Sequence, residues 1–562
     1  MGLMFGFDRL VGWAVRPGRS RAPAPNVKGG GLVFDPKGME RELDRMVDLG
    51  DLARALPRAE LLRFRGAAPT DSSKPQHLTP PSLAAVTIKD LCQDSRKARP
   101  GSVFFAIPGV EQDGAAFASE AVGRGAVAVV ACRPLPVPVP LLVVDDVRAA
   151  LSRVASIFYG QPSRVLPVAG ITGTNGKTTV AHLLAACLQD THGPVGILGT
   201  LGGRLGRDQK DQEIRVSLSN TTPGALEIHR LLREMLSNHC GSAVLEVSSH
   251  ALDQGRVQDV RFQAAVFTSL SQDHLDYHGS MEAYARAKSR LFGLLERGGV
   301  AVLPADDPEA AVMRSQVPPG IRLITWALDK PKNPAECHLQ GEILHQGPRG
   351  TSLRIHAREG MADLELGLIG VHNARNAMAA LAAAMAFKVP LLFAVDRLGQ
   401  AIPVAGRLEE MAGEGRPFPI FVDYAHTPDA LEKACQAVRA LGPKKLRLVF
   451  GCGGDRDRLK RKIMGKIAAQ NADHIVVTND NPRTESPESI IQMILEGVEQ
   501  REGLLVELCP DRGEAIRHVL DQAQEGDAVL IAGKGHERGQ VIGKETVPFD
   551  DREEVRAWLR RN

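Results

Sequence analysis

Residues 165–179 have the sequence VLPVAGITGTNGKTT, in which an apolar run gives way to a glycine-rich turn. Glycines let backbone N–H groups close on a phosphate, Lys177 can reach the terminal phosphates of a nucleotide, and Thr178 can ligate magnesium. A helix-compatible run follows, so a bound phosphate would lie at its N-terminus. Gly170 is one residue too early for the usual GxxxxGK[ST] spacing, and a turn without ligand is the alternative. The motif predicts a nucleotide-binding loop made of Gly173, Thr174, Asn175, Gly176, Lys177, Thr178 and Thr179.

The same change from an apolar run to a polar cluster recurs along the chain. AVLEV leads into SSH, AAVFTSLS into QDHLDYHG, FPIFV into DYAH, LRLVF into GCGGDRD, HIVVT into NDNPR and DAVLIA into GKGHE. In open parallel sheets, ligands bind just beyond the carboxyl ends of the strands. The pattern therefore predicts neighbouring α/β domains whose strand ends face a common cleft.

Composition excludes several classes of protein. A net charge of +3 and an aromatic content of 4% argue against a nucleic-acid surface. No apolar run reaches the roughly 20 residues of a membrane helix, so we expect no stable membrane insertion. The eight cysteines are scattered without a CxxC pair, which indicates reduced thiols in a cytosol rather than disulfides or a zinc site.

The 562 residues are enough for roughly three or four domains. We expect residues 1–84 to be a partly disordered extension, with a charged, helix-compatible stretch at 39–65 and a Pro/Ser-rich linker. A small α/β domain is expected over 85–166. The βα alternation is stronger over 167–402 and restarts after GRLEEM over 403–562.

Three residues in the predicted central domain are candidates for chemistry near the phosphates. Glu246 and His274 follow apolar runs and offer an oxygen and an imidazole to a metal ion, although a helix cap and a satisfied histidine are the ordinary alternatives. Lys288 lies in the helical stretch MEAYARAKSRLFGLLE, where a solvated lysine is the default interpretation.

The predicted C-terminal domain carries a second set of candidates. In VVTNDNPRTE (476–485), Pro482 fixes its own backbone and keeps Asn481 out of a helix, so the loop presents Arg483 rigidly. Arg456 in GGDRD and Glu537 in GKGHE add a second guanidinium and an acid. Two guanidiniums and an acid suit a zwitterion with more than one carboxylate, whereas a lone capped turn with a surface ion pair is the alternative.

Taken together, the motifs resemble the muramyl (Mur) ligases, the cytoplasmic amino-acid ligases of peptidoglycan synthesis. The resemblance runs from about residue 86 to the C-terminus and rests on CQDSRKARPGSVFFAIPG, GTNGKTT, SNTTP, EVSSHALDQGRV, DHLDYHG, GRLEEM, DYAHTPDAL, GCGGDRD, DNPR and AGKGHE. It implies a three-domain α/β fold: a small UDP-binding domain, a central P-loop ATPase domain with a mostly parallel sheet, and a Rossmann-like C-terminal domain. DNPR and GCGGDRD resemble the members that add the third residue of the peptide.

The resemblance also implies roles for individual residues. The implied ATP contacts are the glycine-rich loop with Asn376, Arg407 and Asp423. The implied contacts of the UDP-muramyl dipeptide are Ser95, Asn220, Thr221, Thr222, Ser248, Gln254 and Arg256. The implied magnesium ligands are Thr178, Glu246, His274 and Lys288, the last as a carbamylated lysine; with Lys177, the last three form the implied catalytic group. The implied amino-acid site comprises Arg456, Asp480, Asn481, Pro482, Arg483, Gly533 and Glu537.

The reaction implied is ATP-dependent addition of meso-diaminopimelate to the D-Glu of UDP-MurNAc-L-Ala-D-Glu through an acyl phosphate, by a cytoplasmic monomer. The distal carboxylate of diaminopimelate would pair with Arg483, which lysine would leave unpaired. Three alternatives stay open: the same ligase with L-lysine, a nucleotide-binding scaffold without catalysis, and a relative of folylpolyglutamate synthetase.

Two positions depart from the family pattern, because Ser269 and Pro304 stand where its members often have Asn. Neither belongs to the residues assigned to chemistry, and both bear on nucleotide affinity.

Overall fold

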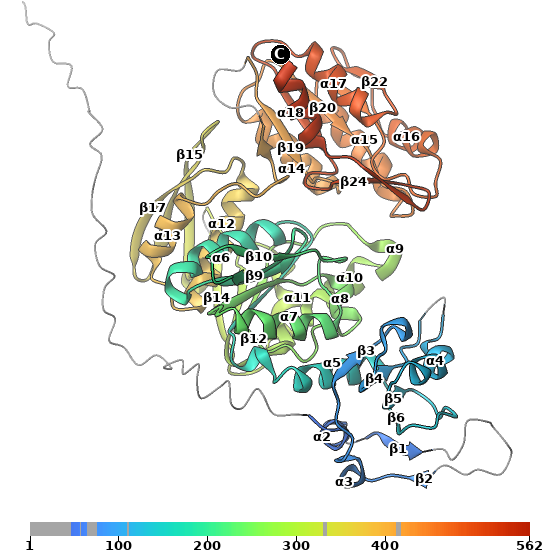
Figure 1. Cartoon of the computed structure of the whole chain (residues 1–562). Coiled ribbons are helices and arrows are strands. Elements are labelled where there is room, and N and C mark those ends of the chain that lie inside the picture. Colours follow the sequence, from blue (N-terminus) through green and yellow to red (C-terminus); the bar gives the residue numbers. More distant parts are fainter. Residues whose placement is uncertain are drawn as a thin grey trace, which may run out of the picture. The chain divides into compact units, whose positions relative to one another are not determined.

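The computed structural model describes residues 47–56, 58–63, 76–109, 112–329, 334–411 and 417–561. Three α/β sheets follow one another along the chain, as the colours of Figure 1 show. The predictions for residues 1–46 and for 69–75 of the Pro/Ser-rich linker lie outside the described residues, whereas 76–82 of that linker contain β2 and most of α3. Short 3₁₀ helices connect several elements: η1 (Ser95–Lys97), η2 (Gly114–Phe117), η3 (Pro162–Arg164), η4 (Phe292–Leu294) and η5 (Pro334–Glu336).

The first sheet has six strands in the order β2-β1-β6-β5-β4-β3. Strands β3 to β6 are parallel, as in other βα units, and β1 adds antiparallel to β6. Strand β1 and helix α2 come from the predicted extension, yet α2 buries Leu49 and Leu52 in this domain's core. The elements are β1 (Glu60–Arg63), β2 (Gln76–His77), β3 (Asp90–Cys92), β4 (Ser102–Phe105), β5 (Ala128–Ala131), β6 (Leu141–Val143), α2 (Leu49–Ala55), α3 (Pro80–Leu83), α4 (Ala118–Gly123) and α5 (Val147–Phe158).

The second sheet has eleven strands in the order β10-β9-β8-β11-β7-β12-β13-β14-β15-β16-β17. Its seven middle strands, β8 to β15 in that order, are parallel, and the outer strands are antiparallel. The predicted apolar runs became fully buried strands, such as β7 (Val168–Thr172), because helices cover both faces of a parallel sheet. The other strands are β8 (Val195–Gly199), β9 (Gly202–Arg207), β10 (Glu213–Val216), β11 (Ser242–Glu246), β12 (Phe262–Phe267), β13 (Leu295–Pro304), β14 (Arg322–Leu328), β15 (Leu339–Gly347), β16 (Gly350–Ala357) and β17 (Gly360–Leu366).

Helices α6 and α12 pack against each other in the largest core cluster of the chain. Helix α12 is rich in alanine, which lets it approach its neighbours closely, and most of its residues are buried. The helices of this part are α6 (Lys177–His192), α7 (Ala225–Ser237), α8 (Ser249–Asp253), α9 (Leu275–His278), α10 (Met281–Ser289), α11 (Ala310–Arg314), α12 (Val371–Ala386) and α13 (Leu391–Gly399).

The third sheet has six strands in the order β18-β19-β23-β20-β21-β22, parallel except for β18. A separate hairpin of β24 and β25 follows it. Apolar clusters cover both faces of the sheet. The elements are β18 (Glu409–Glu410), β19 (Ile420–Asp423), β20 (Leu446–Phe450), β21 (His474–Val477), β22 (Leu505–Leu508), β23 (Ala528–Ala532), β24 (Gly539–Ile542), β25 (Glu545–Pro548), α14 (Pro428–Arg439), α15 (Leu459–Asn471), α16 (Pro487–Leu495), α17 (Arg512–Gln522) and α18 (Asp551–Arg561).

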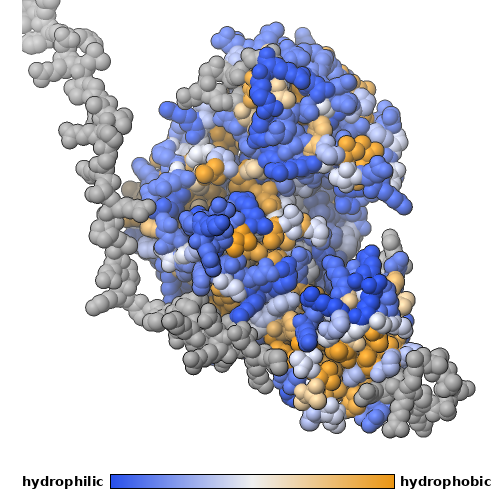
Figure 2. All heavy atoms as spheres, in the orientation of Figure 1, coloured by the Kyte–Doolittle hydropathy of each residue, from blue (hydrophilic) through white to orange (hydrophobic). Residues whose placement is uncertain are grey.

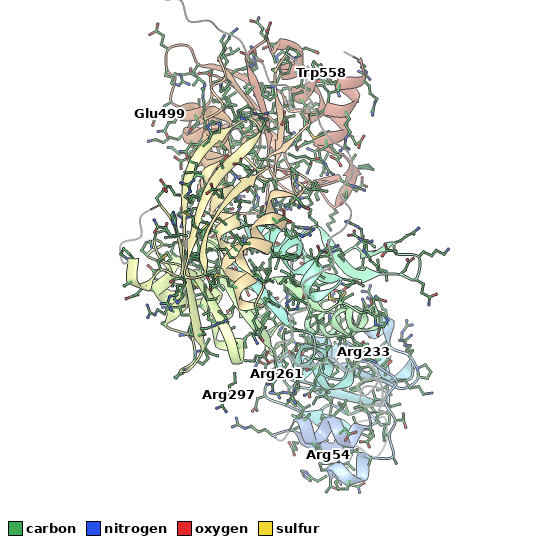
Figure 3. All side chains as sticks on the ribbon, turned by 90° about the vertical axis from the view of Figure 1, so that its left-hand side faces the viewer. Arg54, Arg233, Arg261, Arg297, Glu499 and Trp558 are labelled. Atoms are coloured by element: carbon green, nitrogen blue, oxygen red, sulfur yellow. The ribbon has the colours of Figure 1, made fainter. Side chains whose placement is uncertain are left out.

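Charged side chains mostly lie at the surface. Hydrophilic residues dominate the face in Figure 2, and Arg54, Arg297 and Glu499 project outward from the ribbon in Figure 3. A few charged residues are nevertheless fully buried, which normally requires a partner. Lys288, Arg461, Arg512 and Lys534 are such residues, and they direct attention to the loops at the strand ends.

The described chain contains no helix that is both long enough and apolar enough to cross a membrane.

Candidate active site

The glycine-rich loop connects β7 to α6, and two of its glycines are required by close contacts. Gly173 and Gly176 have φ of +150° and +85°. A Cβ at Gly173 would lie 1.9 Å from the Thr268 hydroxyl, and one at Gly176 would lie 2.4 Å from Asn376 Oδ1. Lys177 is the first residue of α6, and its ammonium donates to the carbonyls of Gly173 and Thr174 at 2.8 and 2.9 Å. The loop thus has the strand–turn–helix form that the motif predicts.

A second lysine reaches the same carbonyl. Lys288 on α10 is 1% exposed, and its Nζ donates to the Gly173 carbonyl at 2.8 Å above the ring of Tyr284. Burial and the nearby ammonium of Lys177 hold the pKa of Lys288 well below its ordinary value. Lys288 is therefore not the solvated helix lysine of the ordinary interpretation.

Thr178 and Glu246 are in direct contact. The Thr178 hydroxyl donates to Glu246 at 2.9 Å and accepts from the Arg407 guanidinium at 2.9 Å. Glu246 also accepts from the backbone N–H and hydroxyl of Thr200, both at 3.0 Å. The buried Nε of Arg407 has no partner among the described residues. Arg407 therefore keeps a donor available beside the loop.

His274 ends a turn at the start of α9, with φ of +54°. Its imidazole lies 3.4 Å from the Asp273 carboxylate and packs edge-on against His250. Burial lowers the pKa of His274 against the opposing charge of Asp273, and the ammonium of Lys288 adds to the lowering. The ring is therefore neutral near pH 7, the form that ligates metals. The described chain has no cluster of three His, Cys, Asp or Glu side chains arranged around a common metal position.

A cavity beside the glycine-rich loop lies between the second and third sheets. It is lined by six of the predicted ATP contacts: Asn175, Gly176, Thr179, Asn376, Arg407 and Asp423. Ser269, one of the two departures from the family pattern, also lines it, whereas Pro304 ends β13. Asn175 crosses to α14, where its amide donates to Asp429 at 2.8 Å. Sequence reasoning missed His372, Asn373 and Lys433, which line the same cavity without a motif of their own.

The cavity between the first and second sheets is larger, about 690 Å³. Asn220, Gln254 and Arg256 line it, as predicted for the muramyl dipeptide, together with several residues that sequence reasoning missed. Thr222 and Ser248 instead brace its wall: Thr222 accepts from the Ser248 N–H at 3.0 Å, and its carbonyl accepts from Arg256 at 2.9 Å. The residues missed include Gln93, Asp94, Arg148, Tyr159 and Arg230.

Two other predicted dipeptide contacts lie away from the lining of this cavity. The buried hydroxyl of Ser95 donates to Glu120 at 2.7 Å. The hydroxyl of Thr221 lies 3.2 Å from that of Thr200, which is itself bound to Glu246. Both hydroxyls are therefore already engaged within the protein.

A third cavity, of about 230 Å³, lies between the C-terminal strand ends and the turn that carries His274. Six of the seven predicted amino-acid contacts line it, and Pro482 does not. Side chains of both charges face this space. The predicted lining residues are Arg456, Asp480, Asn481, Arg483, Gly533 and Glu537, and the residues missed include His426, Asp457 and Lys460.

The backbone of Arg483 is held by the β24–β25 hairpin. Arg483 has φ of +52°, its N–H donates to Val541 at 3.0 Å, and its carbonyl accepts from Gly543 at 2.7 Å. Its guanidinium donates to the Gly454 carbonyl at 2.6 Å, which links it to the GGDRD loop. An unusual backbone conformation held by this many contacts fits a side chain kept in one position.

The same hairpin holds the two residues before Pro482. The side-chain amide of Gln540 donates to the Asp480 carbonyl at 2.7 Å, and the Val541 N–H donates to Asn481 Oδ1 at 2.9 Å. Sequence reasoning missed Gln540, because a glutamine in a surface hairpin carries no signal by itself.

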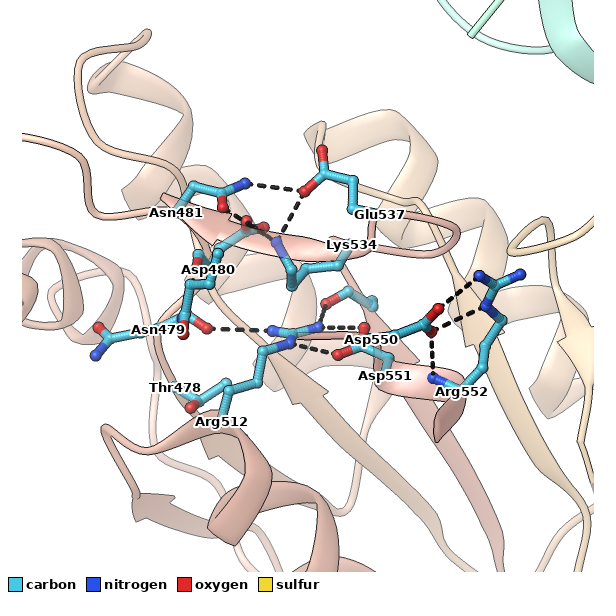
Figure 4. Close-up of polar contacts among 12 residues, drawn as sticks. Thr478, Asn479, Asp480, Asn481, Arg512, Lys534, Glu537, Asp550, Asp551 and Arg552 are labelled. Atoms are coloured by element: carbon cyan, nitrogen blue, oxygen red, sulfur yellow. Dashed lines mark hydrogen bonds and ion pairs between the residues drawn. The ribbon is translucent and has the colours of Figure 1, made fainter. Parts of the chain in front are cut away.

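Lys534 organises the acidic side of the cavity (Figure 4). Its buried ammonium donates to Asn481 at 3.1 Å and to Glu537 at 2.8 Å, and it lies 3.8 Å from Asp480. Burial acts to raise the pKa of Glu537, yet Lys534 and Asn481 keep that pKa below its ordinary value. Glu537 is therefore ionised and can accept from an ammonium group.

Two buried ion pairs support the loops from below. Arg512 pairs with Asp551 at 2.7 Å, both side chains fully buried, and also donates to the carbonyls of Asn479 and Ala532 (Figure 4). Arg461 pairs with Glu485 at 2.8 Å behind the GGDRD loop. Removing one partner of such a pair is costly, so these contacts rigidify the strand-end loops.

Comparison with known proteins identifies the family. Three family models cover most of the chain: Mur ligase family, catalytic domain, over 87–159; Mur ligase middle domain over 171–384; and Mur ligase, glutamate ligase domain, over 406–535. The chain belongs to the Mur ligase family. The predicted family and the three-domain α/β fold, including its mostly parallel central sheet, are thereby confirmed.

Relatives within the Mur ligase family align over nearly their whole length. UDP-N-acetylmuramoyl-L-alanyl-D-glutamate--2,6-diaminopimelate ligase of Geobacillus thermodenitrificans is 43% identical over 473 residues, which cover 83% of this chain and 94% of that protein. The protein of the same name from Synechococcus elongatus is 40% identical, with coverage of 88% and 97%. A solved structure of a ligase of that name matches with a TM-score of 0.62 and 32% identity, covering 92% of this chain and 99% of its own.

More distant structures share the fold alone. A folylpolyglutamate synthase of Mycobacterium tuberculosis has a TM-score of 0.54 at 20% identity and covers 68% of this chain. Its alignment leaves about a third of this chain uncovered, unlike that of the diaminopimelate ligase structure.

Proposed function

We propose that this Mur ligase uses ATP to join meso-diaminopimelate to the D-Glu carboxylate of UDP-MurNAc-L-Ala-D-Glu, as the names of its relatives describe. The observation that carries the proposal is the 230 Å³ cavity beside His274, which two guanidiniums line together with Asp480, Glu537 and three further carboxylates. Such a cavity complements an amino acid that carries both charges at each end. The proposed reaction belongs to peptidoglycan precursor synthesis.

ATP would bind at the cavity between the second and third sheets. Lys177 would contact the terminal phosphates, and Arg407 has a buried Nε that is without a partner among the described residues and can bind an anion. Asn376 and Asp423 line the same cavity, where they would contact the base and the ribose. Positioning and electrostatic stabilisation account for most of the catalysis of phosphoryl transfer.

Magnesium would bind beside the glycine-rich loop, where side-chain oxygens are available as ligands. The touching pair Thr178 and Glu246 offers hard oxygen ligands, and His274 offers a neutral imidazole. Bound magnesium neutralises phosphate charge and so favours transfer of the phosphoryl group.

Lys288 fits the proposed carbamylated lysine. Two ammonium groups on one carbonyl repel each other, and a buried lysine with a lowered pKa exposes the neutral amine that reacts with carbon dioxide. Carbamylation would replace one of the two positive charges by a negative one, which would pair with Lys177 and serve as an oxygen ligand.

The proposed mechanism has two chemical steps. The D-Glu carboxylate attacks the γ-phosphorus of ATP, and Lys177 neutralises charge on the transferred group, giving an acyl phosphate and ADP. The free amine of the amino acid, after losing its proton, attacks the acyl carbon, and phosphate leaves with the bonding electrons. Closure of this cavity, which Tyr424, His426 and Asp273 line, would keep out the water that otherwise hydrolyses the acyl phosphate.

The muramyl dipeptide would occupy the 690 Å³ cavity between the first and second sheets. Asn220, Gln254 and Arg256 would contact it directly, while Thr222 and Ser248 hold the wall. Ser95 and Thr221 would act through their bonds to Glu120 and Thr200. We further propose that the protein acts in the cytoplasm, because ATP and the UDP-linked precursor are cytoplasmic substrates. We propose that it does so as a monomer.

The product tests the proposal directly. Purified protein would be incubated with ATP, magnesium, UDP-MurNAc-L-Ala-D-Glu and meso-diaminopimelate, with each component omitted in turn. We expect phosphate release that needs all four, and a UDP-muramyl tripeptide whose mass has increased by diaminopimelate less water. Phosphate release without a new peptide product would contradict the ligase, and neither product nor phosphate would favour a scaffold without catalysis.

A further inference from the structure

Lys460 is a buried cation that forms no direct ion pair with the described residues. It is the second residue of α15, is 6% exposed and lines the 230 Å³ cavity. Its ammonium has neither a hydrogen bond nor an ion pair with any described residue. Other buried cations nearby are paired: Arg461 with Glu485, Arg512 with Asp551 and Lys534 with Glu537.

A buried lysine is expensive unless something compensates its charge. Arg461, the next residue, pairs with Glu485, so a carboxylate outside α15 is within reach of this part of the helix. Lys460 instead lines the cavity, where Asp273 is close enough to feel its charge but forms no ion pair with it. The absence of an ion pair between Lys460 and any described residue leaves its ammonium available to an anionic group of a ligand in that space.

The cations of the cavity act on different neighbours. Arg483 interacts electrostatically with Arg456, Asp480 and Glu537, which belong to the C-terminal strand ends. Lys460 instead acts on Asp273 and His426. Asp273 adjoins His274 on the central domain, the side at which the acyl phosphate would form. Lys460 thus serves the reacting end of the cavity and Arg483 the distal end.

The chemistry of the acceptor supplies the missing anion. A diamino dicarboxylic acid has two carboxylates, and the arginines of the distal end account for one. The other lies one carbon from the amine that attacks the acyl phosphate, and no residue has so far been assigned to it. We propose that Lys460 binds this reacting-end carboxylate of the incoming amino acid, an inference that rests on the ligase function proposed above.

This contact would do more than increase affinity. Fixing the carboxylate beside the attacking amine restricts rotation about the bond between them, so the amine would point at the acyl carbon. The same cavity would then distinguish an amino acid from a simple diamine at its reacting end, as Arg483 distinguishes diaminopimelate from lysine at its distal end.

Steady-state kinetics of Lys460→Ala provide the first test. We expect the KM for meso-diaminopimelate to rise about tenfold to about a hundredfold, since a charged hydrogen-bond partner is lost. The KM values for ATP and the UDP-muramyl dipeptide should stay within about twofold, which also shows that the variant is folded. Lys460→Arg should recover part of the affinity, and Lys462→Ala, at an exposed lysine on the same helix, should match the wild type.

Two results would overturn the assignment. An unchanged KM for diaminopimelate would mean that Lys460 does not bind the amino acid. A rise in the KM for ATP, with that for diaminopimelate unchanged, would assign the ammonium to the transferred phosphate. If the wild-type protein itself forms no tripeptide, the ligase proposal fails, and this outcome is separate from an effect of the variant.

The two enantiomers of lysine locate the contact. Each lacks one of the two carboxylates of meso-diaminopimelate, at opposite stereocentres. As inhibitors of the diaminopimelate reaction, they should respond oppositely: Lys460→Ala should weaken one enantiomer by about tenfold or more and Arg483→Ala the other. If both variants weaken the same enantiomer, the two cations bind one carboxylate and the assignment of Lys460 is wrong.

Discussion

The nucleotide loop and the amino-acid cavity use charge in opposite ways. At the loop, the side-chain nitrogens of Lys177 and Lys288 both donate to one carbonyl, and the buried Nε of Arg407 has no partner in the part of the chain that the structure describes. In the amino-acid cavity, Arg456 and Arg483 face Asp480 and Glu537, and Lys534 ties the two acids to Asn481. Basic side chains gather at the nucleotide loop around the Glu246 carboxylate, which suits a polyphosphate with its magnesium. The amino-acid cavity is lined by several groups of each sign, which suits a zwitterion.

The difference also appears in how rigidly the two sites are held. Few side chains neutralise the cations of the nucleotide loop, so binding of an anion would complete that site. The amino-acid cavity is supported by the buried Arg512–Asp551 ion pair and by a hairpin that binds the backbone of Arg483. Selection among similar amino acids needs such a preformed site. Discrimination depends on a protein group that the correct amino acid pairs and that a wrong amino acid leaves without its partner.

Removing a charge from the nucleotide loop should have the largest effect. We expect Lys177→Ala to lower kcat by about 10³-fold, since the transferred phosphoryl group loses a cation that acts on its developing charge. Lys210→Ala, at an exposed lysine, is the matched control. Rapid-quench measurement of ADP formation would check this, and a kcat within tenfold of the wild type would break the proposed contrast.

Removing a charge from the amino-acid cavity should affect one substrate only. Arg483→Ala should raise the KM for meso-diaminopimelate about a hundredfold and leave that for ATP within about twofold, because the distal carboxylate loses a charge-assisted partner. Arg538→Ala is the control, since that side chain is 85% exposed. Equal losses for both substrates would mean that Arg483 serves the fold rather than the amino acid.

The contribution of the Arg461–Glu485 ion pair, behind the GGDRD loop, should be measurable in the free energy of unfolding. Side-chain bonds to Arg461, acting against partial burial, lower the pKa of Glu485 from 4.5 to about 2. Its ionised form therefore stabilises the folded protein above pH 4.5, and this contribution is lost as the pH falls towards 2. Glu485→Gln should lower the free energy of unfolding by about 2 kcal/mol at pH 7.

Urea titrations of wild type and Glu485→Gln at several pH values would check that difference. The gap between them should narrow as the pH falls from 4.5 towards 2, whereas Glu496→Gln, at an exposed position, should show no gap. A gap that stays constant with pH would show that the ionised pair is not its cause.

A substitution in the β24–β25 hairpin should have the smallest effect, a change in the selectivity between amino acids. Gln540→Ala removes the donor to the Asp480 carbonyl and should reduce the preference for diaminopimelate over lysine by about tenfold. Lys544→Ala on the same hairpin should leave the preference unchanged. Competition between the two amino acids, with products separated by mass, measures this directly, and an unaltered preference would remove Gln540 from the account.

Sequence patterns predicted the parts of the molecule that local chemistry determines. GTNGKTT and DNPR follow apolar runs directly, and a buried parallel strand that ends in a polar loop needs only nearby residues to be recognised. The family resemblance extended these motifs to part of the lining of each of the three cavities, including half of the residues that line the amino-acid cavity. Pro482 and Ser95 show its limit, since each belongs to a motif but does not line the cavity assigned to it.

Contacts between distant segments could not be predicted in this way. Lys460 lies in a helix full of lysines and arginines, and only packing decides that it faces the cavity while Lys462 faces solvent. Gln540 meets Asp480 across sixty residues of sequence. The pairing of β1 with β6 likewise depends on strands far apart in the chain, so residues before 85 gave no sign of joining the first sheet.

The most direct test of the central claim compares two amino acids in the wild-type protein. The ratio of kcat/KM for meso-diaminopimelate to that for L-lysine would be measured from phosphate release with ATP and UDP-MurNAc-L-Ala-D-Glu saturating. A cavity that binds a zwitterion at each end predicts a ratio of at least about a hundred, because lysine leaves the partly buried Arg483 guanidinium without an anionic partner. A ratio near one, or a preference for lysine, would contradict the account.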